Sequence, residues 1–266
     1  MQVEDLRNIG RRLFKKISGL GYSDKISISA SSGAGGDVTF GIDKIAEDII
    51  LEGLKDLNTP LTAISEEAGI VDMNGGGPKV IIDPVDGSKN AVLGIPFYCT
   101  SIAVAEGDRV ADIKLAYIIN LINGDEFWAA MDAGAFKNNE KIASQKDDTF
   151  YMVAYEAQSS GRDISSIMPL IRRSRKTRCF GATALDLAYL ASGAISVFIS
   201  PSPSRSFDFA AGWLIVKEAG GIFTDTEGNT IDRVRLGLEL STPLLASGNK
   251  KLHKKALELL SGSSSE

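Results

Sequence analysis

Histidine is almost missing from this sequence: His253, in the basic segment NKKLHKKALELL, is the only one. We expect it on the solvated face of a C-terminal helix and not in a catalytic site. Histidine is the side chain that enzymes use most often as a general base near neutral pH. Its scarcity means that any hydrolysis carried out by this chain must rely on carboxylates, hydroxyls or metal ions.

Cysteines and long apolar runs are also scarce. Cys99 and Cys179 lie far apart inside apolar segments, so we expect two buried thiols in a reducing compartment and no disulfide. The chain starts with a polar, charged helix pattern and not with a signal sequence, and no apolar run approaches the roughly 18 residues of a membrane span. The sequence therefore predicts a cytoplasmic protein with no membrane partner.

An excess of positive charge is missing as well. The net charge is −5, with 24% charged and 44% hydrophobic residues, which is ordinary for a globular enzyme and gives no reason to expect nucleic-acid binding. An anionic substrate would have to be held by local cations or by backbone N–H groups. The 266 residues suffice for one large domain or for two smaller ones that share a core.

The first half of the chain has a mixed pattern of helices and strands. Residues 3–17 place apolar side chains on one helical face and basic side chains on the other, which we expect to be solvated. The glycine-rich stretch SASSGAGGD, Ser29–Asp37, is too polar to pack and is predicted to be an exposed, mobile loop. A second helix is predicted over residues 41–57. The remaining segments indicate strands and an Asn-Gly hairpin turn: LTAIS, KVIID, YCTSIAVAE, ADIKLAYIIN and INGDEFWAA.

The second half alternates strands and helices more regularly. The polar segment KNNEKIASQKDD marks a boundary near residue 147. Beyond it, the expected strands TFYMVAY, a short one near CF, AISVFIS and GIFTD alternate with helical patterns such as GATALDLAYLASG and FDFAAGWLIVKEAGG, and PLLASGN and a final amphipathic helix follow. This alternation is typical of an α/β arrangement. We therefore predict an α/β protein in which an α+β half, residues 1–147, packs on an α/β half, residues 148–266.

Acidic residues stand at the ends or starts of several apolar elements. Glu66 follows the strand LTAIS, and Asp83 and Asp86 bracket the end of the strand KVIID. Asp208 opens the helix FAAGWLIV, and Asp43 lies early in the second helix. Carboxylates that share a site repel each other strongly unless cations neutralise them. Mg²⁺ is the natural partner, because it prefers oxygen ligands and leaves room in its shell for water and phosphate.

The segment DPVDGS, residues 83–88, is the centre of this pattern. Pro84 fixes its own φ and keeps the preceding aspartate out of the α region, so that both aspartates can point the same way. The Val85 carbonyl is then available as a further ligand. Gly87 allows a close backbone approach, and a short helix beginning at Ser88 would offer its N–H groups to a phosphate.

Each acid taken alone also has a purely structural explanation. An isolated D-P-x-D-G is often a surface turn, Glu66 would serve equally well as an exposed acid, and Asp208 as a helix cap. Their combination, with order and spacing intact, argues instead for one site that binds metal and phosphate.

Five segments resemble those of the inositol monophosphatase family. SEEAG, DPVDGSKNAVLGIPFYCTSIAVAEG and SFDFAAGWLIVKEAGG look like its three signatures, and GDVTFGIDKIAED and GATALDLAYLASG resemble two further segments. The likeness spans residues 36 to 221 in the right order. NAVLGIPFY in particular is similar to the archaeal group that acts on both inositol monophosphate and fructose-1,6-bisphosphate.

The resemblance implies a layered αβαβα sandwich and a homodimer. It also implies hydrolysis of an inositol or sugar phosphate by water that two or three Mg²⁺ ions activate, with Mn²⁺ as a possible substitute. Particular residues receive roles by the same resemblance, and Glu66, Asp83, the Val85 carbonyl, Asp86 and Asp208 would be the metal ligands. Asp43 and Ser88 would orient the water, Gly87 and Ser88 would bind the phosphate, and the Ser29–Asp37 loop would influence a third metal.

The chain also departs from the family pattern. Ser88 stands where threonine is usual, and Phe207 replaces a common tryptophan. Pro201 occupies the position at which animal enzymes carry a glutamate that contacts inositol hydroxyls, which argues against strict inositol specificity. Candidates for substrate binding besides the phosphate cradle are Asp86, Arg178, Thr183 and Arg205, and the two arginines would favour a bisphosphate.

Other functions fit parts of the pattern. A phosphatase of the haloacid dehalogenase type would need an aspartate where Pro84 stands, two residues before Asp86. An enzyme of the same fold would instead act on 3′-phosphoadenosine-5′-phosphate, and a non-catalytic relative would bind metal or phosphate without turnover. P-loop chemistry is excluded, since no G-x-x-x-x-G-K-[ST] occurs.

Overall fold

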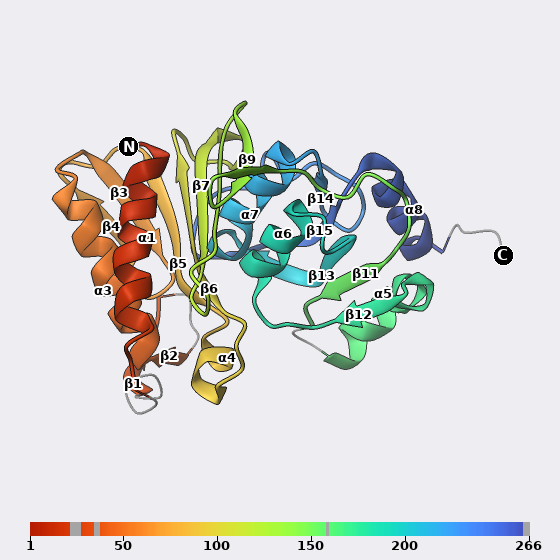
Figure 1. Cartoon of the computed structure of the whole chain (residues 1–266), viewed down its shortest axis with the longest axis horizontal. Helices are drawn as coiled ribbons and strands as arrows, with labels where there is room; N and C mark the ends of the chain where they lie inside the picture. Colours follow the sequence, from red (N-terminus) through yellow and green to blue (C-terminus); the bar gives the residue numbers. More distant parts are fainter. Residues whose placement is uncertain (22–27, 35–37, 158–159, 263–266) are drawn as a thin grey trace.

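The computed structural model describes residues 1–21, 28–34, 38–157 and 160–262, and in this part of the chain two large sheets alternate with layers of helices (Figure 1). The helices are α1 (Val3–Ile17), α3 (Gly41–Asp56), α4 (Ser88–Leu93), α5 (Ser160–Arg173), α6 (Thr183–Ala191), α7 (Ser206–Glu218) and α8 (Lys250–Leu260), with a 3₁₀ turn at Val110–Asp112. None of these helices is both long enough and apolar enough to cross a membrane.

The first large sheet has eight strands in the order β10-β9-β8-β7-β6-β5-β3-β4. All of its pairs are antiparallel except β3 with β5. Its strands are β3 (Leu61–Ser65), β4 (Gly69–Met73), β5 (Lys79–Asp86), β6 (Cys99–Ala105), β7 (Ile113–Asn120), β8 (Glu126–Ala130), β9 (Gly134–Lys137) and β10 (Glu140–Ile142). The connection from β7 to β8 contains the predicted Asn-Gly pair, and Gly124 has the positive φ of 76° that this turn requires.

The second large sheet has five strands in the order β12-β11-β13-β15-β14, and β11 runs parallel to both of its neighbours. These strands are β11 (Met152–Tyr155), β12 (Lys176–Arg178), β13 (Val197–Arg205), β14 (Ile222–Thr224) and β15 (Leu240–Ser247). A separate two-stranded sheet pairs β1 (Ile28–Ser32) with β2 (Val38–Phe40). The predicted boundary near residue 147 lies between the last strand of the first sheet and the first strand of the second. The division into two domains stays a prediction.

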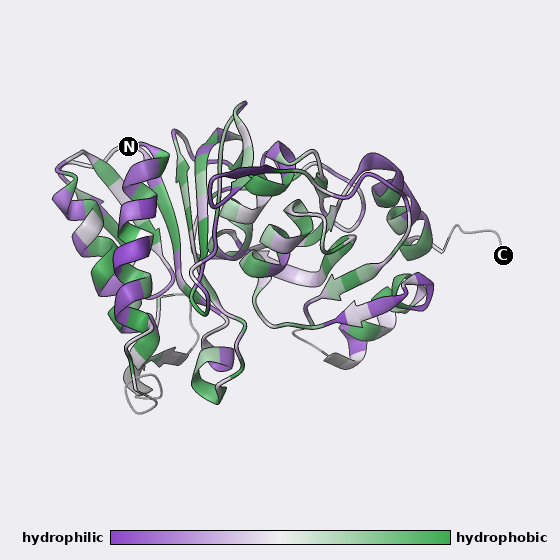
Figure 2. Ribbon diagram, in the orientation of Figure 1, coloured by the Kyte–Doolittle hydropathy of each residue, from purple (hydrophilic) through white to green (hydrophobic). Residues whose placement is uncertain are grey.

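Hydrophobic packing explains the order of the layers. α1 and α3 bury their apolar faces against the outer face of the eight-stranded sheet, and Figure 2 shows the hydrophilic face of α1 turned away from it. α6 and α7 lie between the two sheets, and α7 is apolar on nearly all sides because it is covered on both. α5 and α8 cover the outer face of the five-stranded sheet. The predicted αβαβα sandwich is confirmed.

Several local predictions were wrong. Part of the glycine-rich stretch is not a loop, because Ser29–Ser32 belongs to β1, while residues 35–37 lie outside the described residues. Cys99 is buried as expected, but Cys179 is exposed, because it follows β12 at the edge of its sheet. His253 is only 5% exposed and bonds with Thr224 and Ser247, so it lies on the packed side of α8.

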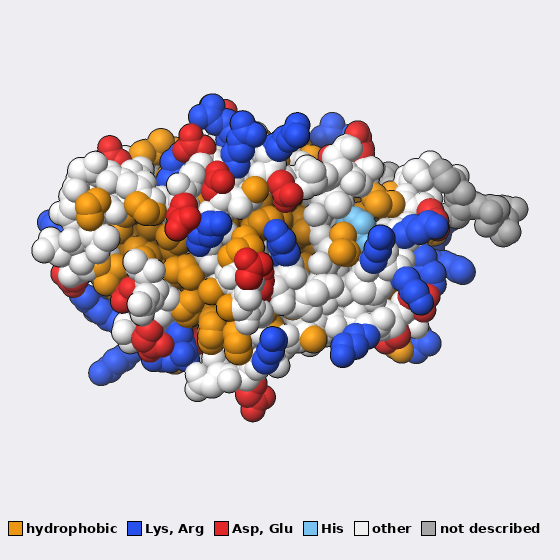
Figure 3. Space-filling model, turned by 90° about the horizontal axis from the view of Figure 1, so that it is seen from above, with side chains coloured by type: hydrophobic (Ala, Val, Ile, Leu, Met, Phe, Trp, Pro, Cys, Tyr) orange, Lys and Arg blue, Asp and Glu red, His pale blue; other side chains and the backbone are white. Residues whose placement is uncertain are grey.

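Three arginines on the basic face of α1 are paired with acids of the protein itself. Arg7 and Arg11 both donate to Oε2 of Glu126 over 2.9 Å, and Arg12 donates to Glu52 over 2.8 Å. Arg7 is buried, contrary to the expected solvated face. Figure 3, a view from above, shows Lys and Arg side chains interspersed with Asp and Glu rather than gathered into one basic field.

Candidate active site

A cavity of about 650 Å³ collects most of the acidic residues that the sequence singled out. Side chains from both large sheets and from the starts of α4, α6 and α7 form its wall. The predicted residues that line it are Glu66, Asp83, Val85, Asp86, Gly87, Ser88, Thr183, Arg205 and Asp208. These residues span positions 66 to 208 of the chain, so the predicted convergence of remote acids is observed.

A bulge in β5 brings Asp83 and Asp86 to the same side. Asp83 pairs with Ser101 of β6, and Asp86 pairs with Cys99, so a step of three residues on β5 faces a step of two on β6. Side chains three residues apart in a regular strand point to opposite faces, and the extra residue of the bulge removes that difference. The carbonyl of Pro84 inside the bulge is satisfied by the Thr100 hydroxyl at 2.6 Å.

Two other acids occupy the same position in their helices. Asp43 is the third residue of α3 and accepts the backbone N–H of Phe40 over 2.7 Å. Asp208 is the third residue of α7 and accepts the backbone N–H of Arg205 over 2.8 Å. Each bond satisfies a donor at the start of a helix and fixes one carboxylate oxygen. Asp208 therefore caps α7, as considered from the sequence, and it also lines the cavity.

Ser88 connects α3 with the end of β5. Its hydroxyl lies 2.5 Å from Asp43 Oδ1 and 2.7 Å from the Val85 carbonyl oxygen, so one proton is shared between two acceptors. Ser88 begins α4, as predicted, and Asp43 stands behind it rather than among the residues that line the cavity. The Ser88 hydroxyl thus links Asp43 directly to the Val85 carbonyl and to any group that binds there.

Gly87 is required by the backbone geometry. Its φ is 90°, a value that favours glycine, and a Cβ there would lie 3.1 Å from Ala182 Cβ, Gly181 O and Phe97 O. The Asp86–Ser88 turn therefore packs tightly against the segment that precedes α6. Ala184 in the first turn of α6 donates its backbone N–H to Asp86 Oδ2 over 2.6 Å, which joins the two halves of the site.

Burial and mutual repulsion disfavour the charged forms of these acids. Burial, and then the charges of Glu66, Asp86 and Asp208, raise the pKa of Asp83 well above its usual range. Burial, followed by the nearby Asp208, does the same to the pKa of Asp86. Burial also raises the pKa of Asp43 to about 7, although its bonds from Ser88 and Phe40 oppose the shift. A bound cation would reverse this balance, because opposite charge favours the ionised carboxylate.

The residues of the cavity fit a hard divalent cation. Oδ1 of Asp83 is buried and has no hydrogen-bond partner, which is costly for a carboxylate unless a cation compensates it. Carboxylate and carbonyl oxygens are the donors that such an ion prefers. Among the described residues, however, no three acidic, cysteine or histidine side chains are already arranged around one ion. One oxygen of Asp86 and one of Asp208 accept backbone N–H groups, which leaves the second oxygen of each carboxylate as a candidate ligand.

Like Asp43, one predicted substrate-binding residue does not line the cavity, and the cavity contains an acid and a cation that were not predicted. Arg178 does not line the cavity: it is exposed, and its guanidinium donates to the Thr177 carbonyl over 2.8 Å. Glu156, directly after β11, lines the cavity, and burial raises its pKa to about 7. The signal that identified Glu66, an acid at the end of a strand, also applied to Glu156. Lys89, the second residue of α4, is an exposed cation at the cavity that was not considered.

Comparisons with known proteins show which family this chain resembles. A model of the inositol monophosphatase family matches residues 6–265. A fructose-1,6-bisphosphatase/inositol-1-monophosphatase of Methanothermobacter thermautotrophicus is 36% identical over 86% of this chain and 85% of its own length. A bifunctional NADP phosphatase/NAD kinase of Methanococcus maripaludis is 31% identical over 95% of this chain and 48% of its own length. The crystal structure of an inositol monophosphatase–fructose 1,6-bisphosphatase superposes with a TM-score of 0.84 at 28% identity, covering 97% of this chain and 100% of that one.

Proposed function

The chain belongs to the inositol monophosphatase family, and from this premise we propose that it hydrolyses fructose-1,6-bisphosphate and inositol monophosphate with Mg²⁺ bound by the acids of the cavity. Its membership of this family, together with archaeal relatives that are named phosphatases, identifies the chain as a phosphoric monoester hydrolase. The family is generally metal-dependent. The choice of ion, the number of ions and the order of preference among substrates are our proposal.

The observation that carries the proposal is the position of Asp83. It is 3% exposed, one of its oxygens has no partner, and Glu66, Asp86 and Asp208 repel its charge. A buried acid in such surroundings costs stability unless a cation is bound. A bound cation would offset this cost, which supports a metal ion as part of the function. Glu66, Asp83, the Val85 carbonyl, Asp86 and Asp208 are the proposed ligands.

Bound Mg²⁺ would activate a water molecule and neutralise the charge that develops on the leaving oxygen. The chain's own groups would orient and hold the reactants. Ser88 Oγ would take a proton from the water as its own proton moves to Asp43 Oδ1, to which the hydroxyl is already bonded. Gly87 lets the phosphate approach the backbone closely at the start of α4, and Thr183 contacts the substrate from the start of α6.

A bisphosphate is favoured by the cations of the cavity. Lys89 and Arg205 are the two basic residues among the described residues that line it. Arg178, which was considered for this role, lies outside. Lys89 makes no hydrogen bond or ion pair with another described residue, so its ammonium is available to an incoming anion. A phosphate at the acidic centre would leave the second phosphate of fructose-1,6-bisphosphate to Lys89 and Arg205.

A substrate panel tests the proposal. Phosphate release in Mg²⁺ would be compared for fructose-1,6-bisphosphate, inositol-1-phosphate, 3′-phosphoadenosine-5′-phosphate and NADP. We expect turnover of the first two, strict dependence on a divalent ion, and loss of turnover in Asp86→Asn and Asp208→Asn with the fold retained. Preference for either nucleotide would reassign the substrate, and Mg²⁺ binding without any turnover would favour the non-catalytic alternative. Trapping of an aspartyl-phosphate would favour the dehalogenase type of mechanism.

Two finer expectations belong to the same proposal. We propose a homodimer, which light scattering after gel filtration would test. A cytoplasmic location stays a prediction.

A further inference from the structure

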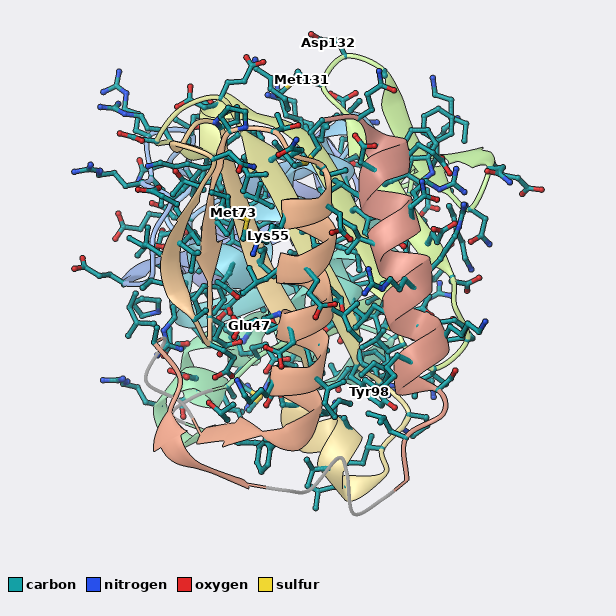
Figure 4. The ribbon with its side chains drawn as sticks, turned by 90° about the vertical axis from the view of Figure 1, so that its left-hand side faces the viewer. Glu47, Lys55, Met73, Tyr98, Met131 and Asp132 are labelled. Carbon is teal, nitrogen blue, oxygen red and sulfur yellow. The ribbon has the colours of Figure 1, made fainter. Side chains whose placement is uncertain are left out.

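Glu47 is not one of the proposed metal ligands or catalytic residues, yet it is a buried carboxylate that contacts the turn containing Glu66. It is the seventh residue of α3 and 5% exposed. In Figure 4 its side chain lies beside the lower half of α3, toward the end of the β3–β4 hairpin. It neither lines the cavity nor makes an ion pair with another described residue. A buried acid of this kind is costly, so its partners indicate what it does.

One oxygen of Glu47 accepts two donors that flank Glu66 and Glu67. The Ser65 hydroxyl donates to Oε1 over 2.5 Å, and the backbone N–H of Ala68 donates to the same atom over 2.8 Å. Ser65 is the last residue of β3 and is fully buried. The two acidic residues between these donors both line the cavity. Glu47 thus holds the ends of a four-residue turn whose middle faces the proposed metal site.

The same helix holds the opposite side of the site. Asp43 lies one turn before Glu47 on α3, and residues four apart share a helical face. Asp43 is bonded to Ser88, beside the Val85 carbonyl, while Glu47 is bonded to the turn that carries Glu66. Because an α-helix is stiff and its rise per residue is fixed, the separation of Asp43 and Glu47 sets the separation of the two groups of ligands.

We propose that Glu47 is a positioning residue, which fixes the Glu66 turn at the distance from β5 that Mg²⁺ binding requires. This inference rests on the proposed Mg²⁺ site. Residues that orient metal ligands typically contribute 10- to 100-fold to metal affinity. Glu47 would act through its acceptor oxygen and not through its charge, since both donors use a single oxygen that a glutamine also possesses.

Calorimetric titration of the full chain with Mg²⁺, without substrate, tests the idea. Glu47→Gln keeps the acceptor and is expected to bind Mg²⁺ within about twofold of the wild type. Glu47→Leu removes it and is expected to weaken binding at least roughly tenfold. Ser65→Ala removes one of the two donors, and its Mg²⁺ affinity should lie between those of the glutamine and leucine variants. Glu52→Gln is the control, because Glu52 is exposed on the same helix and pairs only with Arg12 among the described residues.

The outcomes separate this inference from the proposed function. Unchanged affinity in Glu47→Leu and Ser65→Ala would overturn the positioning role alone. A glutamine variant as weak as the leucine variant would also overturn it, because charge and not hydrogen bonding would then be responsible. If Glu47→Leu does not fold, Ser65→Ala and Glu47→Gln carry the same test. Wild-type protein that binds no Mg²⁺ would overturn the proposed metal site itself, and this inference with it.

Discussion

The Ser88 hydroxyl bridges Asp43 and the carbonyl of Val85, at 2.5 Å from the one and 2.7 Å from the other. This contact joins the start of α3 to the bulged end of β5. The two elements are separated in the sequence and belong to different layers of the fold. The burial that raises the pKa of Asp43 to about 7 places that carboxyl within reach of protonation near neutral pH. The proposed role of this pair is that of a relay that accepts a proton from water.

Removal of the Ser88 hydroxyl should slow hydrolysis strongly. In Ser88→Ala the relay is broken, and kcat is expected to fall roughly 10²- to 10⁴-fold, the usual contribution of a positioned acid–base group. Ser88→Thr retains the hydroxyl and should keep activity within about threefold of the wild type. Steady-state phosphate release at saturating Mg²⁺ gives both values. A fully active alanine variant would exclude the relay.

Lys89 should distinguish a bisphosphate from a monophosphate. Lys89→Met is expected to raise KM for fructose-1,6-bisphosphate roughly two- to fivefold, the scale of one exposed ion pair, and to leave KM for inositol-1-phosphate unchanged. Lys254→Met removes an exposed lysine of α8 and serves as the control. An equal effect on both substrates would mean that Lys89 binds the reacting phosphate and not the second one.

Acid should destabilise the fold in part through His253. Burial lowers its pKa from the ordinary 6.5 to about 4, so the folded protein keeps this ring neutral where the unfolded chain protonates it. This stabilisation is complete above pH 6.5 and is lost as the pH falls toward 4. The resulting decrease in the free energy of unfolding is roughly 2–3 kcal/mol between pH 7 and pH 4.5. His253→Gln should therefore lose less unfolding free energy than the wild type between these pH values in urea titrations. Parallel curves for the two proteins would contradict the shift.

The layers of the fold were predictable because hydrophobic periodicity determines them. α1, α3, α7 and α8 begin and end within a few residues of the expected positions, and α4 begins at Ser88 as predicted. The short strands β4, β9 and β10 were missed. Their sequences are polar or glycine-containing, and their pairing depends on neighbours in the sheet, which a local pattern does not contain.

The acids of the site were predictable because each one stands at the end or the start of an apolar element. The misassigned residues are those whose surroundings come from remote segments. Arg178 is the last residue of the edge strand β12 and does not line the cavity, whereas Lys89, at the start of α4, does. The burial of His253 depends on β14 and β15, which contribute Thr224 and Ser247. Such neighbours are set by tertiary contacts rather than by local sequence.

Thermal unfolding of wild type and Asp83→Asn, each with and without Mg²⁺, tests the central claim most directly. Without metal, the asparagine variant should unfold at a Tm equal to or a few degrees above the wild type, because a buried, repelled charge is gone. Mg²⁺ should raise the Tm of the wild type in a saturable way and leave that of the variant unchanged. An equal rise in both proteins would show that Asp83 binds no metal and would contradict the account.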